Sequence, residues 1–287
     1  MARTFPFPAG GLVSDKMLAA YEADGFLVLT GFAPAGTCAA LRRREYELIE
    51  AFDPQSVRTV FSTEDQAHAR DAYFRDSGDR IRFFFEAGAF DAEGRLTRDK
   101  HGAINKIGHA LHDLDPVFAP FSHDVRLKRL AEGLGLEQPE IVQSMLIVKP
   151  PFIGGEVGMH QDATYLHTDP VTVTGFWIAL EDATAENGCL FAPPGGHLTT
   201  LRERFHYDGG ALVKTTLDPR PFEDATGEPL EAPEGTLVVL HGLLPHRSGP
   251  NTSARRRLAY ALHAVDGTAR WSPDNWLKRP AAGGSAA

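Results

Sequence analysis

Cysteine is scarce in this chain, which has only Cys38 and Cys189 among its 287 residues. Small secreted domains that depend on disulfides carry many more, so this class is excluded and two reduced, partly buried thiols are expected. Long hydrophobic runs are missing as well. No stretch approaches the roughly 20 apolar residues of a membrane-spanning helix, and residues 1–8 lack the apolar segment of a secretory signal. We therefore expect no membrane partner and a cytoplasmic location.

Basic residues are in the minority. The chain has 29 Lys and Arg against 38 Asp and Glu, a net charge of −9, and no long basic stripe. This balance argues against a nucleic-acid partner and leaves a small-molecule substrate as the expected partner. The oligomeric state cannot be inferred from these features.

Apolar residues make up 43% of the chain, enough for one sizeable core. We expect a single domain over residues 1–287, with a helix-rich part at 1–140, a β core at 141–266 and a tail at 267–287. Local patterns predict a helix capped by Ser14 that stops near Gly25, then a strand at 26–29, and further helices at about 34–52 and 124–133. Residues 71–91 are interpreted as a strand pair.

From Ile141 to Ala264 the pattern changes to short apolar strands separated by Gly and Pro turns. This pattern is typical of a jelly-roll. The expected fold is mainly β with flanking helices, around a double-stranded β-helix (jelly-roll, cupin-like) core.

His160-Gln-Asp162 is the most informative motif of the β core. In extended chain, residues i and i+2 point to the same side, so His160 and Asp162 can bind one face of a metal ion. His246 follows the apolar run 235–240 and is the candidate third ligand. Two histidines and one carboxylate, with the opposite face open, suit non-haem Fe(II) and allow a co-substrate and O2 to bind side by side.

Arg257 begins a further apolar run, Leu258-Ala-Tyr-Ala-Leu-His263. A buried arginine near a dicationic iron requires an anion, and the distal carboxylate of 2-oxoglutarate fits, with Ser248 adding a hydroxyl. The alternative is that residues 255–257 form a solvated basic cluster. Strand alternation favours one inward arginine without deciding which.

Other residues are assigned mainly structural roles. His109 and His112, three apart, suit ordinary polar positions better than a metal site. His241 is expected to be structural or to support the metal ligands, and His197 either lines the active site or stabilises its loop. Residues 83–85, three phenylalanines in series, are expected in the core.

Several ordered motifs carry a resemblance to a known family. They are His160-Gln-Asp162, Phe176-Trp-Ile-Ala-Leu-Glu-Asp-Ala-Thr184, Glu186-Asn-Gly-Cys-Leu190, Pro194-Gly-Gly-His197 and the segment from His246 to Arg257. Further matches are Asp24-Gly-Phe-Leu-Val-Leu29, Ser77-Gly-Asp-Arg-Ile-Arg-Phe-Phe-Phe-Glu86, Ile104-Asn-Lys-Ile-Gly-His-Ala-Leu-His112 and Trp271-Ser-Pro-Asp-Asn-Trp276. Together they resemble the phytanoyl-CoA dioxygenase (PhyH) family over nearly the whole chain.

The resemblance implies an Fe(II)- and 2-oxoglutarate-dependent dioxygenase that releases succinate and CO2. His160, Asp162 and His246 match the catalytic iron ligands, and Arg257 with Ser248 matches the pair that binds the distal carboxylate. The resemblance also places Lys106, Met145 and Trp177 in the 2-oxoglutarate pocket. Gly196 stands where the family commonly has serine, a departure on the substrate side.

Two other functions fit the same residues. A cupin-like barrel could hold Zn²⁺ or Ni²⁺ as a hydrolase or isomerase, because these metals accept the same ligands. A non-catalytic protein could bind 2-oxoglutarate as a signal. For the dioxygenase, we expect a small organic substrate.

Overall fold

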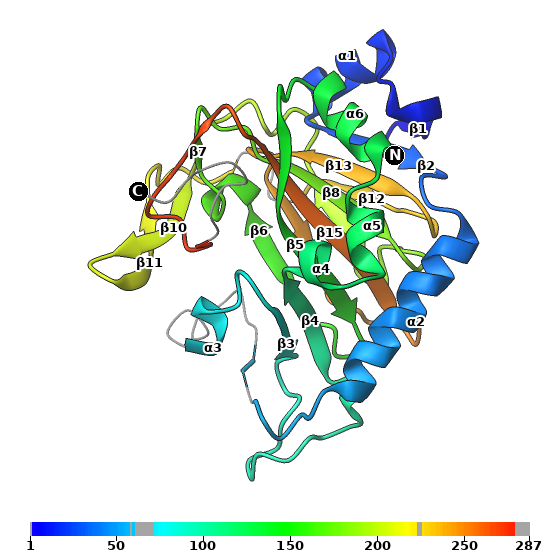
Figure 1. Cartoon of the computed structure of the whole chain (residues 1–287), viewed down its shortest axis with the longest axis vertical. Coiled ribbons are helices and arrows are strands. Elements are labelled where there is room, and N and C mark those ends of the chain that lie inside the picture. Colours follow the sequence, from blue (N-terminus) through cyan, green and yellow to red (C-terminus); the bar gives the residue numbers. More distant parts are fainter. Residues whose placement is uncertain (1, 58, 61–71, 223–225, 279–287) are drawn as a thin grey trace.

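An eight-stranded sheet dominates the computed structural model, which describes residues 2–57, 59–60, 72–222 and 226–278 (Figure 1). Its strands are, in spatial order, β1 (Thr4–Pro6), β2 (Phe26–Thr30), β13 (Leu237–His241), β8 (Thr174–Ala179), β15 (Arg257–Asp266), β5 (Pro139–Lys149), β4 (Ile104–His109) and β3 (Ile81–Phe85). All neighbouring pairs are antiparallel except β1 and β2. The central strand β15 therefore has partners along both edges.

A second sheet of four strands packs against the first. It contains, in order, β12 (Glu228–Leu230), β9 (Leu190–Ala192), β14 (His246–Ser248) and β6 (Val157–His160). One apolar cluster includes Trp177 and Val238 from the large sheet together with Leu190 and Leu230 from the small one. The two sheets thus form the jelly-roll core that the sequence predicts.

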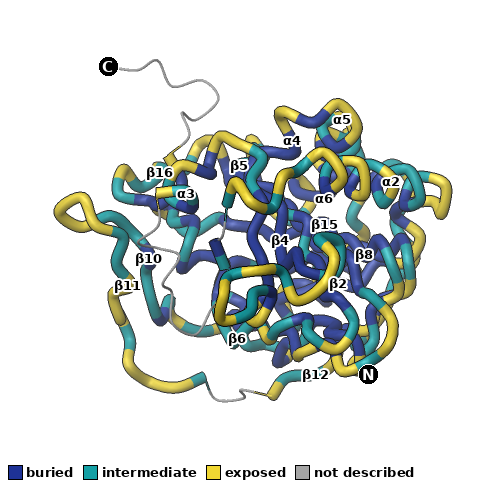
Figure 2. The backbone as a smooth tube through the Cα atoms, turned by 90° about the horizontal axis from the view of Figure 1, so that it is seen from below, coloured by how far each residue is buried: buried dark blue, intermediate teal, exposed yellow. Residues whose placement is uncertain are grey.

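Two short pairs complete the β structure. They are the hairpin of β10 (Glu203–Asp208) with β11 (Ala211–Thr216), and β16 (Arg270–Trp271) with β7 (Thr168–Asp169). The hairpin projects from the body of the molecule and is largely exposed toward its tip (Figure 2).

Helices cover the outer face of the large sheet (Figure 1). The α-helices are α1 (Asp15–Asp24), α2 (Ala35–Ala51), α3 (Ala72–Arg75), α4 (Leu111–Leu114), α5 (Phe118–Ser122) and α6 (Val125–Gly133), and the 3-10 turns are η1 (Ala9–Gly11), η3 (Lys100–Gly102) and η4 (Asp162–Thr164). Among the described residues, no helix combines the length and apolarity needed to cross a membrane.

Strand β15 illustrates why both faces of the large sheet are buried. Leu258, Tyr260 and Leu262 point toward the helices, whereas the alternate positions face the small sheet. Every residue of β15 is buried, and most of its side chains are apolar, as expected for a strand covered on both faces. The face of β15 toward the small sheet carries Arg257 at one end and His263 near the other. These polar side chains require polar partners between the sheets.

The local expectations for the first helices are confirmed. Ser14 accepts a hydrogen bond from Met17 N at the start of α1, and Gly25 ends that helix with a left-handed φ of 80°. Helices α2 and α6 and strand β2 lie where the sequence predicts them. Cys38 and Cys189 are free, buried thiols.

One expectation about the first half is wrong for the described residues. Within 72–91, α3 precedes a single five-residue strand, β3, which pairs with β4 rather than with a strand of its own region. Residue 71 lies outside the described residues. The described α-helices all lie before residue 141, and β1 to β4 from the same part of the chain join the large sheet. These strands pair as β1 with β2, β2 with β13, β3 with β4 and β4 with β5, which local patterns do not predict.

A substitution at Leu237 of β13 tests how much core packing contributes to stability. Leu237 is fully buried among the residues between sheet and helices. Leu237→Ala is expected to lower the free energy of unfolding by about 2–5 kcal/mol, because it removes apolar contacts and leaves a cavity. The measurement is urea denaturation. Leu217→Ala is the matched control: its side chain is 52% exposed, and a change of about 0.5 kcal/mol or less is expected there.

Candidate active site

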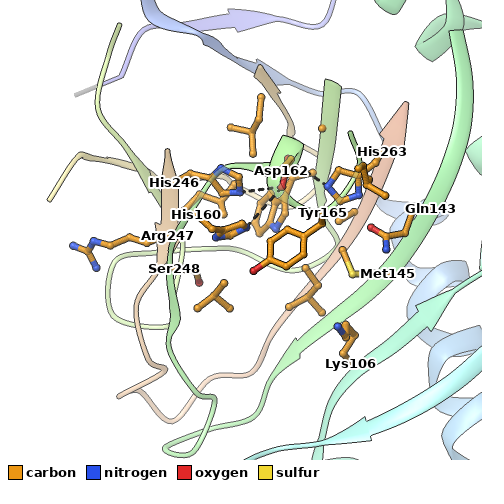
Figure 3. A pocket seen from close by; sticks show the side chains of 18 of the residues that line it. Lys106, Gln143, Met145, His160, Asp162, Tyr165, His246, Arg247, Ser248 and His263 are labelled. Carbon is orange, nitrogen blue, oxygen red and sulfur yellow. Dashed lines mark ion pairs between the residues drawn. The ribbon is translucent and has the colours of Figure 1, made fainter. Parts of the chain in front are cut away.

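A cavity of about 200 Å³ lies between the two sheets and receives side chains from both (Figure 3). A water needs roughly 10–15 Å³ on this scale, so the cavity has room for organic molecules beside an ion. Its lining includes all eight residues that the sequence predicts for the site: His160, Asp162, His246, Lys106, Met145, Trp177, Ser248 and Arg257.

The three predicted metal ligands converge. One ligand atom from each of His160, Asp162 and His246 lies within 4.8 Å of the others. Asp162 Oδ1 is 3.7 Å from His160 Nε2 and 3.6 Å from His246 Nε2. His160 and His246 are register partners on β6 and β14, and Asp162 opens the turn after β6. The small sheet and the turn that follows β6 therefore supply the three side chains.

The hydrogen bonds of the two imidazoles select their tautomers. His160 Nδ1 lies 2.9 Å from Gly158 O, and His246 Nδ1 lies 3.0 Å from Leu244 O. A carbonyl oxygen only accepts, so each Nδ1 carries a proton and each Nε2 is the atom left to bind a metal. Burial and the nearby His246 lower the pKa of His160 to about 4, which keeps that ring neutral. Neutral imidazoles and an ionised carboxylate are the forms that bind a divalent cation.

Asp162 is ionised despite its burial. Burial raises its pKa, but the imidazoles of His263 and His246 more than offset this effect, and the pKa lies well below its usual range. Oδ2, the oxygen that does not face His160 and His246, lies 3.3 Å from His263 Nε2. Figure 3 shows the carboxylate between these two sets of imidazoles.

His263 is the site residue that the sequence analysis missed. It lies on β15, six residues after Arg257, and lines the same cavity. The sequence pattern could have identified it. Side chains alternate along a strand, so if Arg257 points toward the cavity, residue 263 on the same strand should also point toward it. Only the distance to Asp162 required the structure.

Arg257 is the inward arginine of the three. It is 1% exposed, its Nη1 donates to Ile147 O at 3.3 Å, and its guanidinium lies 5.5 Å from the centre of the Trp177 ring. Its Nε has no hydrogen-bond partner among the described residues. Burial lowers its pKa to about 10, so the side chain is still a cation at neutral pH. A buried cation with an unused donor beside a cavity is suited to an anion.

The neighbouring arginines behave differently. Arg256 points to the opposite face, where it forms ion pairs with Glu45 of α2 at 3.2 Å and with Glu181 at 2.9 Å. Arg255 is exposed. The alternative of a solvated basic cluster is therefore wrong for Arg257.

The remaining predicted pocket residues come from several strands. Lys106 of β4 is 5% exposed, with its ammonium 5.3 Å from the centre of the Phe84 ring, and burial lowers its pKa well below the usual value. Met145 of β5 and Trp177 of β8 line the cavity. The Ser248 hydroxyl donates to Gly188 O at 2.9 Å, so toward a ligand its oxygen is an acceptor.

An aromatic wall bounds the cavity on the side of the β10–β11 hairpin. It consists of Phe74, Tyr165, Phe205 and Trp276, which come from four separate segments. The Phe74 and Trp276 rings are stacked with centroids 4.8 Å apart, and Tyr165 lies 5.6 Å from Phe205 and 6.0 Å from His160. The wall thus runs from a candidate metal ligand to the C-terminal segment.

The other histidines have structural surroundings. His109 lies on β4 rather than on a helix, 2.8 Å from the Ser77 hydroxyl, and reaches the cavity wall. His112 is 2.8 Å from the Ser144 hydroxyl. His197 packs against Gly25 and against the His241 ring at 5.0 Å, and does not line the cavity. Residues 83–85 are buried as expected.

Comparison with known proteins agrees with this geometry. The profile of the family described as Phytanoyl-CoA dioxygenase (PhyH) matches residues 21–259. The chain belongs to the phytanoyl-CoA dioxygenase family. It is 44% identical to phytanoyl-CoA dioxygenase domain-containing protein 1 of Bos taurus, covering 93% of this chain and 95% of the relative. It is 43% identical to phytanoyl-CoA dioxygenase of Arabidopsis thaliana, covering 94% and 95%.

Solved structures confirm the fold. The structure of EctD from S. alaskensis with 2-oxoglutarate and 5-hydroxyectoine matches with a TM-score of 0.64 at 22% identity. The match covers 94% of this chain and 84% of EctD. At this identity the likeness establishes the jelly-roll architecture of this family member.

His241 provides a pH test outside the metal ligands. Burial and the nearby His197 lower its pKa to about 4. Between its ordinary pKa of roughly 6.5 and 4, the unfolded chain binds a proton that the folded protein does not, so acidification across this window lowers stability. His241→Asn keeps an acceptor for Leu243 N–H but does not titrate. The variant is expected to lose less stability between pH 7 and 4.5, by roughly 1–3 kcal/mol in urea denaturation. Identical pH profiles for variant and parent would contradict the assignment.

Proposed function

We propose that this protein is an Fe(II)- and 2-oxoglutarate-dependent dioxygenase that hydroxylates a small organic substrate, releasing succinate and CO2. The observation that carries the proposal is the buried Arg257 guanidinium, which shares one cavity with the His160, Asp162 and His246 cluster. A metal-dependent hydrolase has no need of a second, anion-binding end in its cavity.

The residues present fit an iron ion. Two neutral imidazoles and one carboxylate are the donor set of the facial triad of non-haem Fe(II) oxygenases. The Nδ1 hydrogen bonds to Gly158 O and Leu244 O fix both rings in the orientation that presents Nε2. His160, Asp162 and His246 would hold the metal and are the proposed catalytic residues.

The inner face of β15 fits 2-oxoglutarate, which has a carboxylate at each end. The residues on this face are Arg257, Ala259, Ala261 and His263. The two alanines leave space between the Arg257 guanidinium and the proposed metal centre. We propose that Arg257 binds the distal carboxylate through two parallel N–H bonds, the geometry that distinguishes Arg from Lys. Trp177 covers the guanidinium and restricts access of water.

Lys106, Met145 and Ser248 complete the proposed co-substrate pocket. The lowered pKa of Lys106 reflects burial, and an anion in the cavity would favour its charged form. Met145 contributes an apolar, adaptable surface. Ser248 links the end of β14 to the loop before β9, through its bond to Gly188 O.

With iron, 2-oxoglutarate and O2 bound, such a centre supplies the oxidising chemistry, which the protein itself cannot provide. The protein positions the substrate and keeps water away. The aromatic wall of Phe74, Tyr165, Phe205 and Trp276 offers an apolar, planar surface for a substrate body. Gln143, at the same cavity, is a polar group that can orient it.

The decisive experiment loads the purified protein with Fe(II) under anaerobic conditions and then adds 2-oxoglutarate and O2. We expect succinate that depends on all three components, even without added substrate, at the slow uncoupled rate. Exposure of the loaded enzyme to a metabolite extract should yield products heavier by one oxygen atom, only when 2-oxoglutarate is present. Binding of 2-oxoglutarate without any succinate would identify a sensor instead, and activity with Zn²⁺ alone a hydrolase.

Arg257→Gln tests the proposed carboxylate clamp. Hydrogen bonds to charged groups contribute roughly 1.5–3 kcal/mol, so the KM for 2-oxoglutarate in the succinate assay should rise at least about tenfold. Arg255→Gln is the matched control because Arg255 is exposed two positions earlier, and its KM should equal that of the parent. An unchanged KM in Arg257→Gln would remove this residue from the pocket.

A further inference from the structure

Asp162 is held from two sides by different imidazoles. Oδ1 lies 3.7 and 3.6 Å from the Nε2 atoms of His160 and His246, whereas Oδ2 lies 3.3 Å from His263 Nε2. His263 is 7% exposed and does not belong to the group of mutually close ligand atoms. The two carboxylate oxygens therefore have different surroundings.

The sheet leaves space for this arrangement at a single glycine. Gly175 of β8 is the register partner of His263 on β15. A Cβ at Gly175 would lie 2.8 Å from Asp162 Oδ2 and 3.5 Å from Leu240 Cβ. Any larger residue would therefore displace the carboxylate oxygen that faces His263.

The chemistry of the carboxylate defines which atom of His263 carries a proton toward it. An ionised carboxylate only accepts, so the Nε2 atom that faces Oδ2 is the one that donates. His263 Nδ1 has no hydrogen-bond partner among the described residues. Asp162 Oδ2 has no other hydrogen-bond partner among the described residues either, so His263 Nε2, 3.3 Å away, is the polar atom placed to hold it.

We propose that His263 is a positioning residue for Asp162: its Nε2–H holds Oδ2, so that Oδ1 alone is presented to the metal, and Gly175 provides the space. A carboxylate that turned both oxygens to the metal would occupy one more coordination position. His263 therefore keeps an open position available for the reaction. The inference rests on the metal centre of the proposed function, but not on its oxidative chemistry.

Co(II) binding under anaerobic conditions tests the role of His263. Co(II) titration followed by visible absorption measures affinity, and the shape of the spectrum reports the number of ligands. His263→Leu should weaken Co(II) binding about 10–100-fold, the usual effect of losing a group that orients a metal ligand. It should also alter the spectrum, because the freed Oδ2 can turn toward the metal.

His263→Gln is the matched rescue variant, since its amide places an N–H group near the position of Nε2. It should recover most of the lost affinity and the parental spectrum. Parental affinity in His263→Leu would overturn the proposal. Equal losses in the Leu and Gln variants would also overturn it, because they would indicate that His263 acts as a direct ligand or only in packing.

Gly175→Ala on β8 tests the position of the Asp162 carboxylate independently of His263. It should weaken Co(II) binding and change the spectrum, because the added Cβ displaces Oδ2 from its place beside His263. Gly36→Ala is the control, since a Cβ there meets nothing within 4 Å. Parental Co(II) binding by Gly175→Ala would count against the proposal.

Asp162→Ala separates this inference from the proposed function. If Asp162→Ala loses Co(II) binding while His263→Leu retains it, only the positioning role fails. If Asp162→Ala binds Co(II) like the parent, the metal centre itself fails.

Discussion

Burial of charge between two sheets is the constraint on which the rest of this structure depends. Asp162 and Arg257 carry opposite charges into one cavity, yet no direct ion pair joins them among the described residues. Each unmatched charge is costly in an apolar interior. Imidazoles stabilise the carboxylate from two sides, whereas the guanidinium retains an unused N–H group. The cavity is therefore built for a cation at one end and an anion at the other.

Because side chains alternate along a strand, neighbouring charged residues point to opposite faces of the large sheet. Arg257, the first residue of β15, and Arg256 just before it have opposite surroundings. Arg256 forms ion pairs with Glu45 and Glu181 on the helical side, whereas Arg257 lines the cavity. The helices over the large sheet are thereby tied to the strand that bears the proposed clamp. The three candidate metal ligands come instead from the small sheet and the turn after β6, so the site exists only where the two sheets face each other.

The parts of the fold and of the site that depend on neighbouring residues in the sequence could be predicted. The i, i+2 spacing of His160 and Asp162, the cap at Ser14 and the Gly and Pro turns of the β core are short-range signals, and each led to a correct element or pair. The pairing of β3 with β4 and the entry of β1 and β2 into the large sheet depend on distant partners. The space at Gly175 and the contact of His263 with Asp162 also arise only in three dimensions. Roles of Lys106, Met145 and Trp177 came from family resemblance, because packing alone would explain their residue types.

The β10–β11 hairpin has a consequence for how such a protein diversifies. It contributes Phe205, Glu203 and Lys214 to the cavity but belongs to neither main sheet. Replacements there leave the pairing of β15, β8, β6 and β14 untouched. Sequence changes in this one peripheral hairpin can thus reshape the cavity wall, while the cluster of His160, Asp162 and His246 stays constant.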